Sequence, residues 1–450
     1  MSDNTLIEKL LKLPEFEITD FKQNEHDMGF YVQKRERPIV CPACGSYYPE
    51  LVIYKTRKQT IRDLNIQDQR VGLILSRHYY QCRECGGRFA EPISCVDGSG
   101  RITNRLRQYL ADRAKTESFT NIENELQISR PTIRKAFLEE IKKLPTVSTM
   151  ATPSVLGIDE ICLMKDDYSR KQPWAVIANG DDHTVMELLR NRSKPTIIAL
   201  LQSLKDPQKV KVVTMDMWAG YRNAVYEVLP NALVVIDKFH IVKMATEQMD
   251  SIRRRYSRTA PSQLKRNKAV FLMREDKLSP KSIEVRDAWF AEYPVLAQTY
   301  RLKESFFNMY SCPTRESAEA YFLDWQKSIP KETDYNGFRL LARTVHRCQK
   351  EVFNYFDVPE TNAFVEGLNN VIRAISTQGK GYDFDVLRGK VLFTAGRKIV
   401  RPRIDFSTIS LATPDSWRSK PNLPPQYGLP EDDGIPFSAV MDAVKNGCYL

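Results

Sequence analysis

The chain has 450 residues, 42% of them hydrophobic, and carries 67 Lys and Arg against 56 Asp and Glu. This length exceeds what one core holds and predicts two to four domains. The apolar content excludes a disordered protein. The formal net charge of +11 favours a polyanionic partner. Residues 51–150 hold 18 Lys and Arg against 11 Asp and Glu, so seven of these charges lie in one front segment.

The opening stretch "MSDNTLIEKLLKLPEF" has no uninterrupted apolar core, so we expect no signal peptide. No apolar run approaches the ~20 residues that cross a bilayer, so we expect no membrane partner. Nine cysteines are too few for a disulfide scaffold. These features together predict an intracellular, cytoplasmic protein.

Four of the nine cysteines form two Cys-x-x-Cys-Gly knuckles, with Cys41 and Cys44 in "CPACG" and Cys82 and Cys85 in "CRECGG". Two such knuckles complete a tetrahedral sulfur site of the kind that zinc favours. Alternation in "RVGLILSRHYYQC" predicts a β-hairpin that brings the knuckles together. Redox pairs remain the alternative. We interpret the zinc as structural, because four thiolates leave no open position for water.

From residue 101 the pattern becomes helical. "NRLRQYLADRAK" and "TNIENELQI" read as helices, and "SRPTIRKAFLEEIKKL" follows, with Ser129 as N-cap and Pro131 in the first turn. This order predicts a helix-turn-helix. Its second helix would carry a basic face toward a major groove through Arg130, Thr132, Arg134 and Lys135. An ordinary helical pair with a solvated basic face is the alternative.

Beyond a Ser/Thr-rich linker, strand and helix patterns alternate in the order β-β-β-α-β-α-β-α over residues 154–256. A hairpin turn at Asp181 and Asp182 joins the second and third strands. This order predicts an α/β fold with a mixed sheet, the first strand lying beside the fourth. Asp159 lies in the first strand and Asp216 ends the fourth, so their carboxylates are expected to be neighbours.

A third acidic residue, Glu366, lies in the otherwise apolar helix "NAFVEGLNNVIR". Three carboxylates can hold two Mg²⁺ ions for phosphodiester chemistry. The same helical stripe contains Asn362, Asn369, Asn370 and Arg373, which we expect to orient Glu366 or to contact DNA and its phosphates. Simpler roles exist for each residue, since an Asp at a strand end often caps a helix and a buried Glu can pair with a cation.

These motifs resemble a known family. "GIDE", "VTMDMWAGYRNAV", "VIDKFHIVK" and "TNAFVEGLNNVIRAI", behind the two cysteine knuckles, resemble the ISL-three type of bacterial insertion-sequence transposases, from the zinc ribbon to about residue 400. The resemblance implies an RNase H-like catalytic domain of the DDE kind. Its catalytic triad falls on Asp159, Asp216 and Glu366, with Mg²⁺ or Mn²⁺ as cofactor. It gives Asp237 and His240 accessory catalytic roles, although His240 also fits a structural role.

The predicted organisation is a zinc-ribbon module (1–100), a helix-turn-helix (101–148), a catalytic domain in two parts (151–243 and 356–412), a helical insertion (244–355) and a C-terminal tail (413–450). The sheet of the catalytic domain has five strands. The insertion holds a basic run that we expect to line a DNA path or to be a solvated helix face, namely Arg253, Arg254, Arg255 and Arg258.

The sequence therefore predicts a nucleoid-associated transposase that binds the terminal inverted repeats of its own element, cuts DNA and joins the freed end to target DNA. Synapsis of two ends implies a homodimer or larger. Two other classes remain open at this stage. One is a DNA-binding regulator with an inactive RNase H-like domain, and the other is a structure-selective, metal-dependent nuclease.

Overall fold

The computed structural model describes residues 12–96, 100–165, 171–257, 266–360, 362–379 and 381–396. The chain divides into Met1–Lys398 and Ile399–Leu450, and the second unit lies outside the described residues. Arg258 of the predicted basic run and the predicted tail at 413–450 also lie outside the described residues. No described helix is long and apolar enough to cross a membrane.

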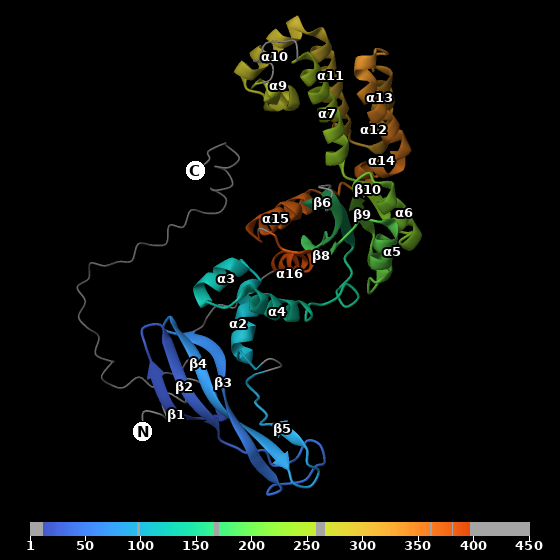
Figure 1. Cartoon of the computed structure of the whole chain (residues 1–450). Helices are drawn as coiled ribbons and strands as arrows, with labels where there is room; N and C mark the ends of the chain where they lie inside the picture. The colour runs from blue at the N-terminus through green and yellow to red at the C-terminus, as the bar shows by residue number, and fades with distance from the viewer. Residues whose placement is uncertain are drawn as a thin grey trace, which may run out of the picture. The chain divides into compact units, whose positions relative to one another are not determined.

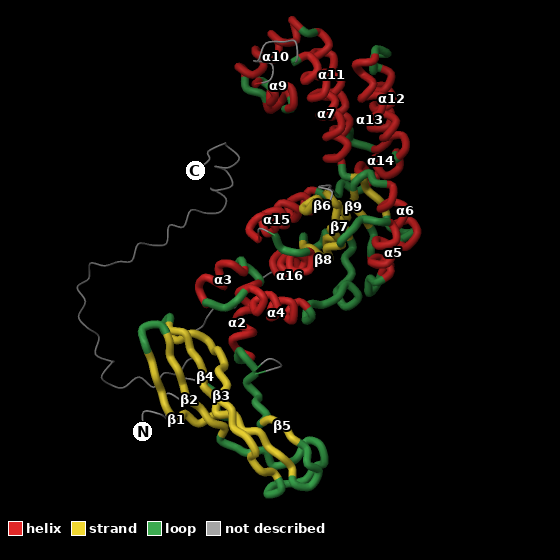
Figure 2. Tube along the Cα trace, in the orientation of Figure 1, coloured by secondary structure: helices red, strands yellow, loops and turns green. Residues whose placement is uncertain are grey.

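The first sheet is built around a long hairpin (Figures 1 and 2). Its order is β1-β2-β4-β3, with β5 on β4, and only the β2–β4 pair is parallel. Gln67 and Asp68, both with positive φ, form the two-residue turn that the twist of a hairpin favours. The predicted hairpin is confirmed. The strands are β1 (Phe16–Gln23), β2 (Asp27–Lys34), β3 (Leu51–Ile66), β4 (Gln69–Cys82) and β5 (Arg88–Ala90).

Three helices follow in the predicted order: α2 (Asn104–Ala114), α3 (Phe119–Leu126) and α4 (Arg130–Ile141). The Ser118 side chain caps α3 by accepting a hydrogen bond from the Asn121 N–H. Gln127, in the left-handed conformation, ends α3, and Ser129 begins α4. The turn between the two helices is thus three residues long.

The second sheet has the order β10-β9-β6-β7-β8. The β6–β9 and β9–β10 pairs are parallel, whereas β6, β7 and β8 pair antiparallel. The predicted mixed five-stranded sheet, with its first strand beside its fourth, is confirmed. The strands are β6 (Val155–Lys165), β7 (Lys171–Asn179), β8 (Thr184–Leu189), β9 (Val212–Met215) and β10 (Leu233–Ile236).

Helices cover both faces of this sheet. Ile158 and Met215 point into the core under α5 (Lys194–Gln202) and α6 (Ala219–Val228). Residues at the alternate positions of the strands, such as Ile161, point into the opposite core under α15 (Ala363–Gly379) and α16 (Phe384–Thr394). Because the side-chain period of a strand is two, Asp159 shares the face of Ile161 and lies beneath α15.

A helical region connects β10 to α15. It comprises α7 (Lys238–Tyr256), α9 (Lys268–Leu272), α10 (Pro280–Glu292), α11 (Pro294–Asn308), α12 (Arg315–Lys327), α13 (Asn336–Arg347) and α14 (Gln349–Asp357). Short 3-10 turns lie at η1 (Pro207–Lys209), η2 (Glu275–Lys277), η3 (Met309–Ser311) and η4 (Thr333–Tyr335).

The limits predicted for the insertion, 244 and 355, fall inside α7 and α14. The buried face of α7 continues past residue 244, from Ile241 through Ala245 to Met249, so the helix does not end there. At the other limit, α14 is bonded to the sheet, because the Asn354 side-chain amide donates to the Val234 carbonyl at 2.7 Å. Both helices are therefore shared between the helical insertion and the domain that holds the sheet.

Lys390 of α16 joins the helix-turn-helix to the second sheet's helices. Its buried ammonium donates to the carbonyls of Ala114 (2.5 Å) and Glu117 (2.7 Å). Three rings surround the same ammonium, those of Phe119, Phe137 and Tyr382. Burial lowers the pKa of Lys390 to about 8. α4 and α16 thus share one core with α15.

Gly157 of β6 allows α15 to approach the sheet closely. A Cβ at this position would lie 2.6 Å from Val365 Cγ2, 2.9 Å from Phe364 Cζ and 3.0 Å from Asn362 Oδ1. These distances are too short for real contacts, so any side chain at 157 would push α15 outward.

We predict that Gly157→Ala lowers the free energy of unfolding by about 1–3 kcal/mol, the usual effect of overpacking. Gly367→Ala, in the same helix, is the matched control. A Cβ there meets nothing within 4 Å, so it should raise stability by about 0.5–1 kcal/mol through helix propensity. Thermal unfolding of the two variants measures both effects, and equal stability would disprove the close approach.

Candidate active site and zinc centre

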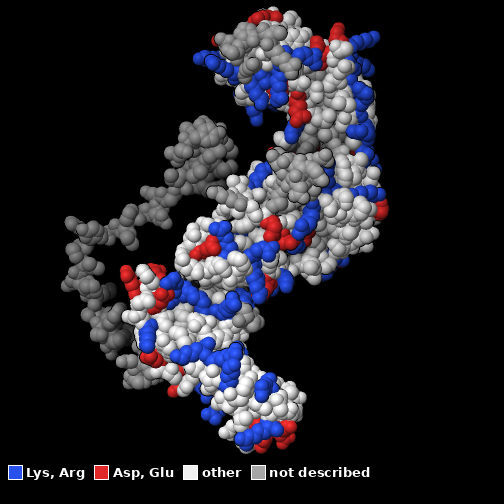
Figure 3. All heavy atoms as spheres, viewed as in Figure 1, with Lys and Arg blue, Asp and Glu red and all other residues white. Residues whose placement is uncertain are grey.

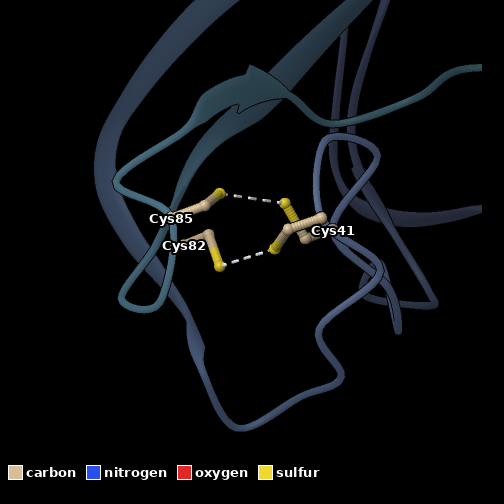
Figure 4. A group of neighbouring side chains, drawn as sticks. Cys41, Cys82 and Cys85 are labelled. Carbon is tan, nitrogen blue, oxygen red and sulfur yellow. Dashed lines mark hydrogen bonds between the residues drawn. The ribbon is translucent and has the colours of Figure 1, made fainter.

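The four knuckle cysteines form one cluster at the open end of the β3–β4 hairpin, opposite its turn (Figure 4). Their sulfur atoms all lie within 4.8 Å of one another. Sγ–Sγ distances are 3.8 Å for Cys41–Cys85 and 3.7 Å for Cys44–Cys82. A tetrahedron with Zn–S bonds of about 2.3 Å has edges close to these values. The geometry therefore fits a closed tetrathiolate zinc site.

The two knuckles have the same local structure. The N–H of Gly45 donates to the Cys41 carbonyl and that of Gly86 to the Cys82 carbonyl, and both glycines have positive φ, 76° and 71°. A residue with a Cβ is strained there, which explains the Gly after each motif. Hydrogen bonds from Ser46 lower the pKa of the Cys44 thiol to about 6 and so favour the thiolate that binds metal.

Asp159 lies beneath α15, and Asp216 lies beside it. In the parallel β6–β9 pair Ile158 is opposite Met215, and the residues that follow them are Asp159 in β6 and Asp216 directly after β9. Burial raises the pKa of Asp159 to about 6, and the Asp216 charge acts in the same direction. Burial also raises the pKa of Asp216, against a hydrogen bond from the Trp218 N–H. A buried and a half-buried carboxylate beside each other are an arrangement that a divalent cation stabilises.

Two asparagines anchor α15 above this pair. Asn362 accepts a hydrogen bond from the Thr214 hydroxyl at 2.8 Å and donates to the Ile158 carbonyl at 3.3 Å. Asn369 donates from Nδ2 to Asp159 Oδ2 at 2.8 Å. Its buried Oδ1 has no hydrogen-bond partner among the described residues. An unpaired amide oxygen beside a carboxylate is a suitable additional group for a cation or its bound water.

Glu366 lies on the same helix but is exposed. Its charge contributes to raising the pKa of Asp237, whose main cause is burial. Asp237 directly follows β10 and caps α7. In the described part of the chain only the cysteines gather within 4.8 Å as metal ligands do. Glu366 therefore belongs to the same region as the aspartates without closing a compact site with them.

His240 lies in the first turn of α7 with Nε2 3.8 Å from Asp159 Oδ1. Its charge, when protonated, opposes the upward pKa shift of Asp159, Asp216 and Asp237 alike. The imidazole thus faces the carboxylate group.

Comparison with known proteins agrees with this geometry. Residues 156–391 match the transposase family DDE_Tnp_ISL3, and residues 37–85 match the zinc-finger of transposase IS204/IS1001/IS1096/IS1165. The chain belongs to the ISL3 transposase family. A similar protein is the transposase for insertion sequence element IS1001 of Bordetella parapertussis, 23% identical over 368 residues, covering 79% of this chain and 88% of that protein.

This ISL3 transposase is accordingly an enzyme of the DDE class that acts on DNA and depends on a divalent metal, with a zinc ribbon in its front module. Family membership decides against the two alternatives left open by the sequence, the inactive regulator and the structure-selective nuclease.

An ion pair that the sequence did not predict lies on the opposite face of the sheet. Glu160 pairs with Arg192, and the Arg192 guanidinium lies 4.9 Å from the ring centre of Trp218. The Glu160 charge raises the pKa of Asp216. The sequence "DE" contains the information that predicts this pair. Asp159 and Glu160 are neighbours on a strand and point to opposite faces of the sheet, so only Asp159 can lie beneath α15.

Lys and Arg side chains gather over the helix-turn-helix and the adjoining strands (Figure 3). Within α4, three of the four residues expected at DNA have protein partners. Arg130 pairs with Glu123 at 2.5 Å, Arg134 with Asp383 at 2.6 Å, and the Thr132 hydroxyl bonds the Ser129 hydroxyl at 3.0 Å. Lys135 is exposed. The arginine pairs are at least 30% exposed and so weak enough to exchange for DNA contacts.

Two residues expected at DNA are buried. Arg253 is 5% exposed and its guanidinium donates to Asp250. Asn369 is 3% exposed and bonded to Asp159. In the protein alone each side chain is thus held by an aspartate, and its contact with DNA stays a prediction.

Four other members of these two groups are exposed. Arg254 pairs with Asp250 and Arg255 with Asp334. Asn370 accepts a hydrogen bond from Arg373 at 2.8 Å, and both face solvent. These four side chains remain accessible to a nucleic acid.

Cys82→Ser should remove the bound zinc, because the tetrahedral site loses a thiolate, and should unfold the front module. Metal analysis by mass spectrometry measures the zinc content. Cys95→Ser is the control, since Cys95 lies in the same module outside the cluster and should retain zinc. Absence of zinc from the wild-type protein would contradict the assignment.

Proposed function

We propose that Asp159, Asp216 and Glu366 form the catalytic triad of this transposase. The enzyme would bind the terminal inverted repeats of its own element through the zinc ribbon and the helix-turn-helix, cut there, and join the freed 3′-OH to target DNA. The observation that carries the triad is the position of α15. Asn362, directly before α15, and Asn369 within it bond β9 and β6, so the helix that holds Glu366 is fixed over these two strands.

The three carboxylates would hold Mg²⁺ or Mn²⁺. The ions supply charge neutralisation for the carboxylates, activation of the attacking oxygen and stabilisation of the leaving oxygen. Support comes from two features of the protein. The two aspartates have raised pKa values, and the unpaired Asn369 Oδ1 lies beside one of them.

The chain's own residues perform the positioning. Asn369 fixes one oxygen of Asp159 and leaves Oδ1 of that carboxylate facing His240. His240 would act as a positioning residue near the scissile phosphate, and Asp237 would hold the first turn of α7 that carries it. Water and the 3′-OH would be the nucleophiles, so the protein needs no covalent intermediate.

End recognition would use the exposed face of α4. Arg134 and Lys135 would reach base edges in a major groove, with Arg130 and Thr132 beside them. Arg134 first has to leave Asp383. That exchange costs little, since an exposed ion pair contributes about 0–1 kcal/mol. Two ends must be held together for transposition, which favours a homodimer or a larger assembly on DNA.

Arg134→Ala should weaken binding to the terminal repeat by about 1–3 kcal/mol and binding to random DNA far less, because a base contact is sequence-specific. Fluorescence anisotropy with the two duplexes measures the difference. Equal losses on both duplexes would assign Arg134 to a phosphate instead.

Glu366→Gln should abolish both cleavage and strand transfer in Mg²⁺ and Mn²⁺, because one carboxylate site would serve both steps. End binding should be retained. The melting temperature should not fall, since removing a charge near Asp237 relieves repulsion. Glu360→Gln, an exposed residue shortly before α15, is the control and should cut normally. Clear cleavage by Glu366→Gln would remove Glu366 from the triad.

A further inference from the structure

A cavity of about 460 Å³ opens beside the proposed triad. Glu366 and Asp237 form one side of it, and the helical region between β10 and α15 forms the rest. The remaining lining residues are Lys238, Phe239, Val242, Thr246, Leu272, Arg274, Phe307, Tyr310 and Ala363. The roles proposed above use Glu366 and Asp237 at one wall and leave the rest of the cavity unassigned.

The cavity offers an aromatic surface at its entrance. Phe239 is 48% exposed although it lies in the first turn of α7, next to His240. On the same helical stripe, Val242 and Thr246 continue the wall inward, and Phe307 contributes a buried ring. An exposed phenyl ring above an apolar wall is the arrangement on which a planar heterocycle stacks.

Two polar groups that line the cavity, the Tyr310 hydroxyl and the Arg274 guanidinium, can form further hydrogen bonds. The buried Tyr310 hydroxyl has no hydrogen-bond partner in the described residues, although buried hydroxyls normally have one. The Arg274 guanidinium lies 5.5 Å from the ring centre of Phe307, and its side chain is 35% exposed. A ligand that carries its own donors and acceptors would satisfy these groups, and a purely apolar ligand would not.

The charges of the cavity decide which part of a nucleotide fits. Asp237 and Glu366 would repel a phosphate at this wall. The two cations of the lining have other partners, because Lys238 donates to the Tyr355 hydroxyl and Arg274 lies near Asp276 and Glu304. A nucleobase is uncharged, planar and rich in hydrogen-bonding edges. DNA is the partner of this enzyme, and the strand being cut has to pass the carboxylates at the cavity's edge.

We propose that this cavity binds a single nucleobase, unstacked from the DNA end next to the scissile phosphate, with Phe239 stacking on its face and Tyr310 contacting its edge. The inference rests on the proposed function of Asp159, Asp216 and Glu366. Holding one base out of the helix fixes the register of the strand, so the scissile phosphate is placed at the carboxylates. Unstacking costs a few kcal/mol, which stacking on an aromatic ring offsets.

The test uses duplexes of the element's terminal inverted repeat with 2-aminopurine placed in turn at each position around the cut. Wild-type protein, without added Mg²⁺, should raise the fluorescence several-fold at one position adjacent to the cut, because a base leaving the stack loses its quenching neighbours. Phe239→Ala should abolish this rise while end binding remains. Phe239→Trp should keep the base unstacked.

Cleavage after addition of Mg²⁺ gives the second measurement. Phe239→Ala should cut at least about tenfold more slowly, and an abasic nucleotide at the responding position should restore most of its rate, because nothing then needs to be unstacked. Leu323→Ala is the matched control. Leu323 is 46% exposed on α12 and outside the cavity, so this variant should behave as wild type.

Two outcomes would overturn the proposal. One is a wild-type complex that cuts the end although no position brightens. The other is brightening that survives unchanged in Phe239→Ala. Failure of the proposed function looks different, since the wild-type protein would then bind the repeat and show no cleavage in Mg²⁺ at all.

Discussion

Hydrogen bonds between the central strands and two asparagine side chains, Asn362 directly before α15 and Asn369 within it, hold the candidate active site together. Asn362 joins β9 to β6 through Thr214 and Ile158, and Asn369 bonds the carboxylate of Asp159. All of these groups are buried, so each bond lost would leave an unpaired polar atom in a region of low dielectric. The same contacts set the height of Glu366 above the sheet. They require a glycine at 157, because any Cβ would occupy the space of α15.

The contact between α15 and the sheet joins segments that lie far apart in the sequence, and the rest of the structure brings them together. α15 lies about two hundred residues beyond β6, and the intervening helices have to return the chain to the same sheet. α14 does so through the bond from Asn354 to β10. Beyond α15, α16 carries Lys390 into a ring of aromatic side chains and couples the catalytic sheet to the helix-turn-helix. The helix-turn-helix and the helix that carries Glu366 thus share one apolar core.

Local patterns were sufficient to predict much of this fold. Strand alternation and the order of elements gave the sheet, and knuckle spacing gave the cysteine cluster. The sequence did not predict the burial of a polar side chain where that burial depends on a partner residue elsewhere in the fold. Asn369 and Arg253 looked like exposed polar residues because nothing local shows that Asp159 or Asp250 faces them. The triad itself remains a proposal, and Glu366 lines the same cavity as Asp237, which the order of elements did not predict.

A crystal structure of the wild-type protein with its terminal repeat and Mn²⁺ would test the central claim most directly, since anomalous scattering locates the ion without reference to the protein. The account predicts manganese bound by carboxylate oxygens of Asp159, Asp216 and Glu366, with Asn369 still bonded to Asp159. Manganese held by Asp159, Asp216 and Asp237, with Glu366 turned to solvent, would contradict it.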